Sequence, residues 1–128
     1  MTALSDLAKR LIDEKTFAVV STVNPDGSPQ SSVIWIKREG DTVVFSTIRG
    51  RRKTRNLERD PRVSVTLYDP ADPYRYVEVR GSVSLAEEGG PELIEELSQK
   101  YDGAPFREGN PANVRVVVRV TPTKVVDR

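Results

Sequence analysis

A dense cluster of cations between residues 49 and 55 is the part of this sequence most suited to chemistry. Five of these seven residues are Arg or Lys. The cluster follows an expected strand and opens an expected short helix, where free backbone N–H groups and the helix dipole favour an anion. Arg51 can grip a phosphate through two nitrogens, Lys53 adds a point charge and Thr54 offers a hydroxyl. A phosphate site is therefore one reading, and a solvated basic turn is another.

A nucleic-acid patch is the third reading of the same cluster. The rest of the chain has no matching basic stripe and no aromatic platform on which bases could stack. The net charge of +1 supplies no overall field toward nucleic acid or anionic lipid. We therefore expect no nucleic-acid partner.

Two residue types are absent, and their absence narrows the possible chemistry. The chain has no Cys and no His. Disulfides, thiolate nucleophiles and Cys-ligated metals are excluded, and the usual catalytic base and commonest transition-metal ligand are missing, so we expect no metal site. An enzyme with this sequence would take its reactive group from a cofactor or from the substrate. A protein without catalytic activity is equally compatible.

Composition also bears on location. No apolar run approaches the roughly 20 residues that span a bilayer, so we expect no membrane partner. The first residues lack the basic region and long apolar core of a signal peptide. These observations predict a cytoplasmic protein.

Aromatic residues in strand-like segments are candidates for the wall of a pocket. Trp35, the only Trp, either packs in the core or an interface, or forms a wall of a substrate pocket. Tyr74 and Tyr76 either pack across a strand or reach a site. Arg80 either hydrogen-bonds a ligand or is solvated. The residue types do not choose between these alternatives.

Hydrophobic spacing predicts the elements that must position these residues. Period-two and β-branched runs predict about six strands, at residues 16–23, 30–37, 42–47, 62–68, 74–85 and 114–120. Helical spacing predicts helices over 3–14, within the basic cluster up to Asp60-Pro61, and from Pro91 to Tyr101. Gly81 suggests a bulge or a sharp bend. We therefore predict one mainly β domain over residues 1–128, a closed or half-closed antiparallel barrel with flanking helices.

Several short motifs, taken in order, resemble the pyridoxamine 5′-phosphate oxidase-like superfamily. The motifs are Phe45-Ser46-Thr47, the run from Arg51 to Leu57, Asp60 to Ser64, and Val79 to Val83. The resemblance is nearest to the short branch that uses the deazaflavin coenzyme F-420. It implies a six-stranded antiparallel split β-barrel, of the FMN-binding split-barrel type, that forms a homodimer. Two equivalent cofactor sites would then lie at the subunit interface.

The resemblance also implies roles for individual residues. Arg51 and Lys53 would bind the cofactor phosphate, helped by Thr54. Tyr74 and Tyr76 would reach the site from the partner subunit. A further set would line the cofactor between its phosphate and its ring: Ser46, Thr47 and Ile48 along the connecting chain, and Gln30, Ser32 and Val33 at the ring.

The activity implied by the resemblance is hydride transfer from the reduced coenzyme to a small electron-poor acceptor. Quinones, tetrapyrroles and nitroaromatics are acceptors of this kind. The carboxylate-bearing tail of coenzyme F-420 suits the additional cations Arg49, Arg52 and Arg55. The alternatives are an FMN-binding flavoprotein or flavin reductase, and a cofactor-binding protein without catalysis. The sequence identifies no catalytic side chain.

Overall fold

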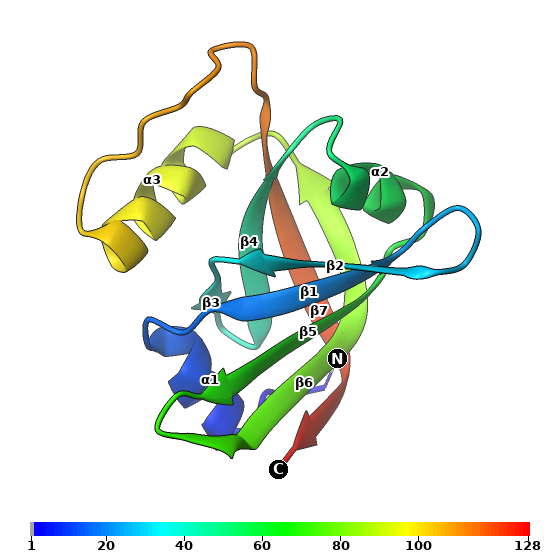
Figure 1. The fold of residues 1–128 in the computed structure, drawn as a ribbon, viewed down its shortest axis with the longest axis vertical. Coiled ribbons are helices and arrows are strands. Elements are labelled where there is room, and N and C mark those ends of the chain that lie inside the picture. Colours follow the sequence, from blue (N-terminus) through cyan, green and yellow to red (C-terminus); the bar gives the residue numbers. More distant parts are fainter. Residues whose placement is uncertain (1) are drawn as a thin grey trace.

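In the described part of the chain, seven strands form one antiparallel sheet, with three helices packed around it (Figure 1). The structure, a computed structural model, describes residues 2–128. The strands are β1 (Ala18–Val23), β2 (Pro29–Ile34), β3 (Lys37–Glu39), β4 (Thr42–Ile48), β5 (Arg62–Asp69), β6 (Asp72–Ala86) and β7 (Arg115–Asp127). The helices are α1 (Asp6–Asp13), α2 (Arg52–Arg59) and α3 (Gly90–Asp102). The mainly β architecture with flanking helices agrees with the prediction from the sequence.

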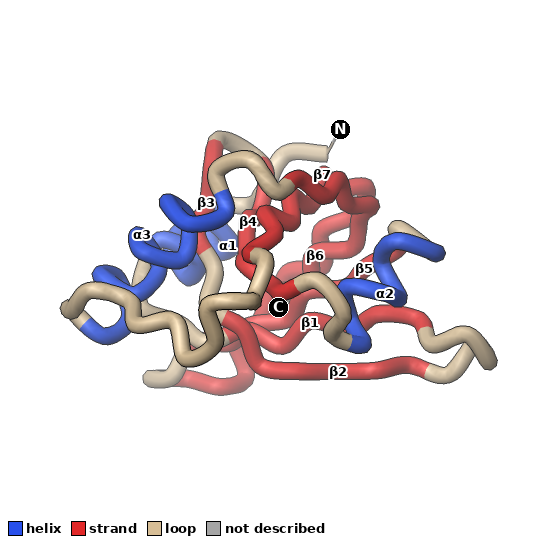
Figure 2. The backbone as a smooth tube through the Cα atoms, turned by 90° about the horizontal axis from the view of Figure 1, so that it is seen from above, coloured by secondary structure: helices blue, strands red, loops and turns tan. Residues whose placement is uncertain are grey.

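The sheet is strongly curled but is not closed by hydrogen bonds. Its strands follow the order β2-β1-β5-β6-β7-β4-β3, so β2 and β3 are its two ends. Figures 1 and 2 show the sheet wrapped around its buried side. The prediction of six strands was wrong, because the expected strand over residues 30–37 is interrupted at Trp35 and Ile36. Its last residue pairs instead with β4 as part of the short strand β3.

The core fills the concave side of the curled sheet. Each of the central strands places a fully buried side chain there: Val20, Val65, Val79, Val118 and Phe45. Burying each such side chain contributes about 1.5–3 kcal/mol. Helix α1 covers one end of this core with Leu7, Ala8, Leu11 and Ile12, as its helical spacing predicted.

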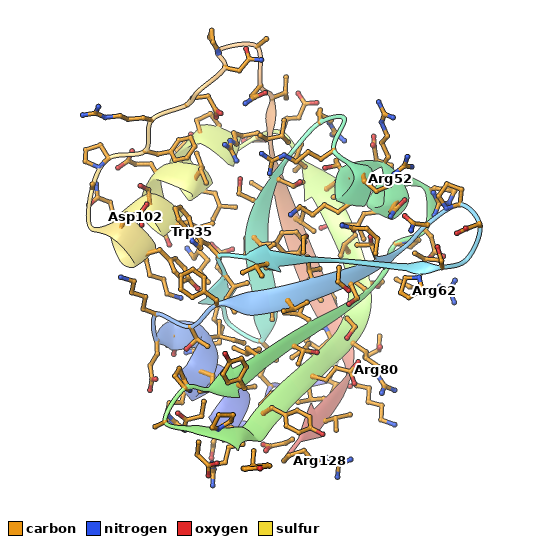
Figure 3. All side chains as sticks on the ribbon, viewed as in Figure 1. Trp35, Arg52, Arg62, Arg80, Asp102 and Arg128 are labelled. Atoms are coloured by element: carbon orange, nitrogen blue, oxygen red, sulfur yellow. The ribbon has the colours of Figure 1, made fainter. Side chains whose placement is uncertain are left out.

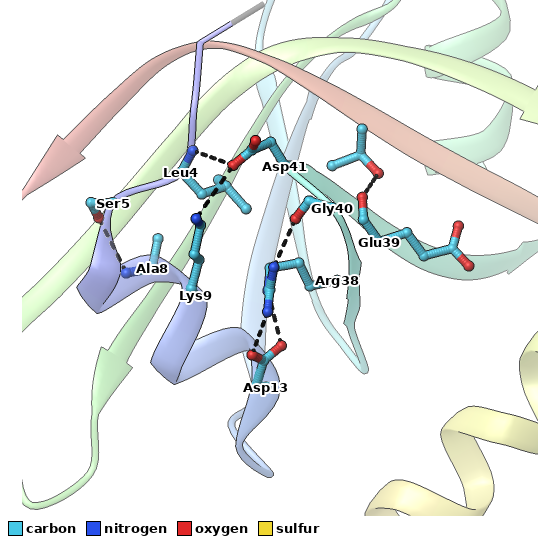
Figure 4. A network of polar contacts seen from close by, with 10 residues as sticks. Leu4, Ser5, Ala8, Lys9, Asp13, Arg38, Glu39, Gly40 and Asp41 are labelled. Atoms are coloured by element: carbon cyan, nitrogen blue, oxygen red, sulfur yellow. Dashed lines mark hydrogen bonds and ion pairs between the residues drawn. The ribbon is translucent and has the colours of Figure 1, made fainter.

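Polar contacts attach α1 to the turn between β3 and β4 (Figure 4). Ser5 caps the helix by accepting a hydrogen bond from the backbone N–H of Ala8 at 3.2 Å. The guanidinium of Arg38 donates to both oxygens of Asp13, at 3.0 and 2.8 Å. The N–H of Leu4 donates to Asp41 at 3.0 Å. The helix therefore holds β3 in place although that strand is only three residues long.

Side chains from the end of α3 satisfy the backbone where the second predicted strand breaks. The Ile36 N–H donates to the Tyr101 hydroxyl at 3.1 Å, and Lys100 Nζ donates to the Ile36 carbonyl at 2.7 Å. The Tyr101 hydroxyl in turn donates to the carbonyl of Thr16 at 2.6 Å. Trp35 stacks on the Tyr101 ring, with centroids 5.3 Å apart and planes 4° from parallel. Helix α3 thus stabilises the break and orients Trp35.

Replacing Tyr101 with Phe is expected to lower the free energy of unfolding by about 1–3 kcal/mol, because buried backbone groups at Ile36 and Thr16 lose their partner. Tyr101 is only 2% exposed, so water cannot readily replace the hydroxyl. Urea unfolding followed by Trp35 fluorescence measures the change. Tyr68→Phe is the matched control, since Tyr68 is 51% exposed. Equal stability of the two variants would contradict this account.

Candidate functional site

The site is built around Lys53, a cation without a matching anion. Lys53 lies in the first turn of α2 and its side chain is buried, with 8% of the residue exposed. Its Nζ donates to the Ser32 hydroxyl on β2 at 3.0 Å. Within residues 2–128, neither Lys53 nor Arg51 makes an ion pair with a carboxylate. Because an unpaired buried charge is costly, this pair favours an anionic ligand.

The pKa of the Lys53 ammonium group reflects the lack of a nearby negative charge. Burial lowers the pKa of its ammonium group, and the positive charge of Arg51 lowers that pKa further. Arg51 is exposed and occupies the residue before α2, where its side chain makes no capping hydrogen bond. A bound phosphate would relieve both effects by placing negative charge beside the two cations.

Replacing Lys53 with Met is expected to raise the midpoint of thermal unfolding of the ligand-free protein. A lysine whose pKa falls on folding opposes folding while it is protonated. That penalty is complete below the folded pKa and disappears as the pH rises toward the ordinary value of 10.5. Calorimetry at neutral and alkaline pH should therefore show a gain that shrinks with rising pH.

The control for this measurement is Lys124→Met, because Lys124 is exposed on β7. It should leave the midpoint almost unchanged at both pH values. A lower midpoint for Lys53→Met than for the unmodified chain would show that the ammonium stabilises the fold.

A cavity of about 160 Å³ lies beside Lys53. Its walls come from β2 and the residue after it, from β4, from the start of α2 and from α3. The lining residues are Val33, Ile34, Trp35, Ser46, Arg51, Lys53, Ile94 and Leu97. Figure 3 shows Trp35 between the end of β2 and α3, away from Arg52 on α2. The cavity therefore has cations at one side and an aromatic wall at another.

Ser46 carries an unsatisfied polar atom in this wall. Its Oγ is buried and has no hydrogen-bond partner in the described part of the chain. Buried hydroxyls nearly always have a partner, so an isolated one that lines a cavity fits a ligand atom. Together, Ser46, Arg51 and Lys53 offer a hydroxyl and two cations to a phosphate-bearing group.

The structure brings together some of the predicted site residues but not all of them. Val33, Trp35, Ser46, Arg51 and Lys53 line the cavity, and Ser32 is hydrogen-bonded to Lys53. Gln30 lies farther along β2, where its side chain accepts a hydrogen bond from Thr22 at 2.9 Å. Gln30 is not among the lining residues.

Three other predicted residues lie beneath the site. The hydroxyls of Thr47 and Thr54 are 2.9 Å apart, and Thr54 donates to the Ile48 carbonyl at 2.7 Å. Thr47 and Thr54 are completely buried, and Ile48 is 7% exposed. The hydroxyl of Thr54 therefore fixes α2 against β4 instead of facing the cavity, which corrects the expectation that it is offered to a phosphate.

Tyr74 and Tyr76 lie on the outside of β6, far from the Lys53 cavity of the same chain. Tyr74 is 89% exposed and Tyr76 is 37% exposed. Neither lines the cavity. They begin β6 near α1, whereas α2 lies at the other end of the sheet (Figure 1).

The three other arginines of the basic cluster, Arg49, Arg52 and Arg55, differ in whether they form ion pairs with carboxylates. Arg49 pairs with Glu58 and Glu87, each at 3.1 Å, so a ligand tail would compete with two carboxylates for it. Arg52 and Arg55 are exposed on α2 and make no ion pair with another described residue. Two of the three expected tail contacts therefore remain open.

Some residues of the site were not anticipated. Ile94 and Leu97 of α3 form a wall of the cavity. Their helical spacing predicted that they would be buried, but it could not show against which element. Asn56 is also buried and donates to Thr22 and Asn24, each at 3.0 Å. It ties α2 to the end of β1 and so holds the basic cluster in position.

An apolar face lies next to the cavity on the outside of β1, β2, β5 and β6. It consists of five exposed side chains: Phe17, Val19, Val33, Tyr68 and Tyr76. Val19 and Val33 are cross-strand partners, as are Tyr68 and Tyr76. A groove of about 330 Å³ runs along this face and shares Val33 with the Lys53 cavity.

Comparison with known proteins agrees with this arrangement. The family model for pyridoxamine 5′-phosphate oxidase matches residues 4–128. This protein belongs to the pyridoxamine 5′-phosphate oxidase-like superfamily. The superfamily resemblance found in the sequence motifs is therefore confirmed. The match covers nearly the whole chain, including the basic cluster and every wall of the cavity.

A solved structure relates the chain to one branch of this superfamily. A protein named F420 reductase is 33% identical, with a TM-score of 0.83 over 92% of this chain and 94% of that one. This similarity confirms the relation to a branch of the superfamily linked to F-420.

More distant structures share the fold alone. A conserved hypothetical protein from Mycobacterium tuberculosis is 24% identical, with a TM-score of 0.80 over 98% of this chain and 84% of that one. A pyridoxamine 5′-phosphate oxidase-related, FMN-binding protein from Nostoc punctiforme is 12% identical, with a TM-score of 0.64 over 97% and 84%. These likenesses show that the fold is shared.

None of the helices in residues 2–128 combines the length and apolar character needed to cross a membrane. In the same part of the chain, no three acidic side chains are placed to hold a metal ion. The charged groups that line the cavity itself are both cations.

Proposed function

We propose that this protein is a cytoplasmic oxidoreductase that binds coenzyme F-420 and promotes hydride transfer to a small electron-poor acceptor. The observation that carries the proposal is the unpaired Lys53 ammonium, which shares a cavity with Arg51 and the unpartnered Ser46 hydroxyl. When bound, the reduced deazaflavin supplies the hydride. Quinone-, tetrapyrrole- and nitroaromatic-like compounds are the proposed acceptors.

The residues of this chain bind and orient the two reactants. Arg51 and Lys53 hold the phosphate through charge-assisted hydrogen bonds, each worth about 1.5–3 kcal/mol. Val33 and Trp35 provide apolar surface that orients a planar ring and keeps water from it. No side chain of the chain needs to give or take a proton for this step, which suits a site without His or Cys.

A second copy of the chain completes the site in this proposal. The cavity of 160 Å³ is smaller than the roughly 300–1,000 Å³ of most ligand pockets. The larger apolar groove shares Val33 with it, so a partner seated on the apolar face would extend the cavity into a full pocket. Tyr74 and Tyr76 of that partner would then reach the coenzyme.

Replacing Val19 with Glu is expected to convert the dimer to a monomer and to weaken coenzyme binding. The change puts a charge at the centre of the apolar face, opposite Val33 on β2. Val19 does not line the cavity, so the phosphate contacts stay intact. Sedimentation velocity measures the assembly, and coenzyme titration measures the affinity.

The control is Val114→Glu, because Val114 is 41% exposed, close to the 40% of Val19, but lies just before β7 and outside the apolar face. It should leave the sedimentation coefficient unchanged. A Val19→Glu dimer with normal affinity would show that this face is not the interface.

The identity of the coenzyme is the finer part of the proposal. Coenzyme F-420 and FMN share a ribityl phosphate, so Arg51 and Lys53 suit both. The exposed and unpaired Arg52 and Arg55 favour a ligand that continues past its phosphate into a chain of carboxylates. FMN is the alternative cofactor, in which case the protein is a flavin reductase or a carrier.

The test of the proposed function is titration of the ligand-free protein with coenzyme F-420 and, separately, with FMN. Trp35 lines the cavity, so its fluorescence reports directly on occupation of the site. Tight binding of the deazaflavin with weak FMN binding, followed by oxidation of reduced coenzyme by an acceptor, is the expected result. Coenzyme binding without oxidation by any acceptor would indicate that the protein carries the cofactor without catalysing a reaction.

A further inference from the structure

The Lys53 amine has surroundings that set it apart from the other lysines of the chain. Lys9 pairs with Asp41 at 3.9 Å, and Lys37 pairs with Glu39 at 3.2 Å. Lys15 and Lys124 are exposed to solvent. Lys37 also lines a cavity with a second cation, Arg119, but several glutamates line that cavity too. The cavity beside Lys53 has a second cation and no carboxylate in its lining, and the Lys53 Nζ has a single hydrogen bond, to Ser32.

Lys100 provides the most informative comparison because it is half-buried and so, like Lys53, is partly removed from solvent. Its Nζ donates to the carbonyls of Ile12 and Ile36, at 2.6 and 2.7 Å. Two strong acceptors therefore hold its protons, and it does not line the Lys53 cavity. Burial is common to both lysines, whereas the open cavity and the adjacent guanidinium belong to Lys53.

A lysine amine attacks a carbonyl only when it is unprotonated. Desolvation and a neighbouring cation are the two features that favour the neutral amine. Both act on Lys53, since burial lowers the pKa of its ammonium group and Arg51 adds to the effect. Its position in a cavity gives a small carbonyl compound access to the nitrogen.

We propose that Lys53 is a carbonyl-reactive amine that forms a reversible imine with small phosphorylated aldehydes, whose phosphate is held by Arg51. The Nζ lone pair attacks the carbonyl carbon, and the resulting carbinolamine loses water to give a carbon–nitrogen double bond. No electrons are transferred and no other reactant is consumed. Hydrolysis reverses the step.

The size and lining of the cavity favour a small partner. At 160 Å³ it accommodates about five water volumes of roughly 30 Å³ each, enough for a three-carbon chain and part of a phosphate. The unpartnered Ser46 hydroxyl can donate to the carbonyl oxygen as it becomes the hydroxyl of the carbinolamine. Arg51 retains the phosphate while the bond forms, which raises the effective concentration of the aldehyde.

This inference rests on the anion site of the proposed function but not on the identity of the coenzyme. An aldehyde bound to Lys53 would occupy the place of the coenzyme phosphate. The modification would therefore block coenzyme binding until the imine hydrolyses, which makes it a regulatory event at the same site.

The experiment treats the whole ligand-free chain with glyceraldehyde 3-phosphate and cyanoborohydride, which reduces the imine to a stable amine. Peptide mass spectrometry then measures the adduct at each lysine. We expect the adduct at Lys53 to exceed that at Lys100 and the other lysines by about tenfold or more, through the raised effective concentration. Glyceraldehyde without the phosphate should label Lys53 far less. Uniform labelling, or an unlabelled Lys53, would overturn the proposal.

Lys53→Arg separates this inference from the proposed function. The variant keeps a cation for the coenzyme phosphate but has no amine, so it should retain measurable coenzyme binding and lose the adduct. Excess inorganic phosphate should suppress the adduct in the unmodified chain. Coenzyme binding without an adduct at Lys53 would refute the imine and leave the proposed function standing. An adduct at Lys53 in a chain that binds no coenzyme would support the imine and contradict the proposed function.

Discussion

Replacing Lys53 or Arg51 with Ala is expected to weaken coenzyme binding by about tenfold or more each, because each change removes a charge-assisted hydrogen bond. Lys53 should show the larger loss, since its ammonium is buried and no carboxylate competes for it. The double variant should bind more weakly than either single one. Calorimetric titration with coenzyme F-420 measures these affinities.

Arg52→Ala is the matched control, because Arg52 lies between the two residues, carries the same charge and does not line the cavity. It should reduce the coenzyme affinity less than either cavity variant does, because Arg52 would contact only the coenzyme tail. All three variants should fold. Normal affinity in the double variant would remove the phosphate-site assignment, whereas equal losses in all three would indicate general attraction of an anion to a basic surface.

Replacing Gly81 with Ala is expected to destabilise the fold by about 1–3 kcal/mol or more, as overpacking does elsewhere. A Cβ at this position would lie 2.2 Å from the Thr121 carbonyl oxygen and 2.9 Å from its carbon. These are backbone atoms of β7 at the point where the register with β6 shifts between Arg80 and Gly81. The strands would have to separate along the longest pairing in the sheet.

Gly109→Ala is the control for this variant, because a Cβ on Gly109 meets nothing within 4 Å. It should leave the midpoint of urea unfolding almost unchanged, while the Gly81 variant unfolds at clearly lower urea. Coenzyme affinity of the folded Gly81→Ala fraction is a second measurement. Similar stability of the two variants would show that the bulge is able to adjust.

In our proposal, two copies of the chain together form each coenzyme site. The Lys53 cavity lies within one copy, where the strand β2 and the helices α2 and α3 meet. The open side adjoins the apolar face, which one copy leaves exposed. In our proposal the partner therefore contributes both the cover for that face and the tyrosines that the cavity lacks.

Much of the fold could be predicted from the sequence, and the proposal of an anion site also began there, because the relevant signals are local. Alternation of apolar residues marks strands such as β5 and β6, and helical spacing marks α1 and α3. A basic cluster at the junction of a strand and a helix indicates an anion, since the exposed N–H groups of that junction are a local property. The absence of His and Cys narrowed the chemistry without any structure.

Tertiary structure alone decided which of these residues face the Lys53 cavity. The break at Ile36 depends on Tyr101, 65 residues away, so the pattern of residues 30–37 could not reveal it. Thr54 turns its hydroxyl inward because the Ile48 carbonyl lies there, and Arg49 is occupied because Glu87 lies within reach. The physical reason is that periodicity specifies whether a side chain is buried, whereas its partner is set by contacts between segments far apart in the chain.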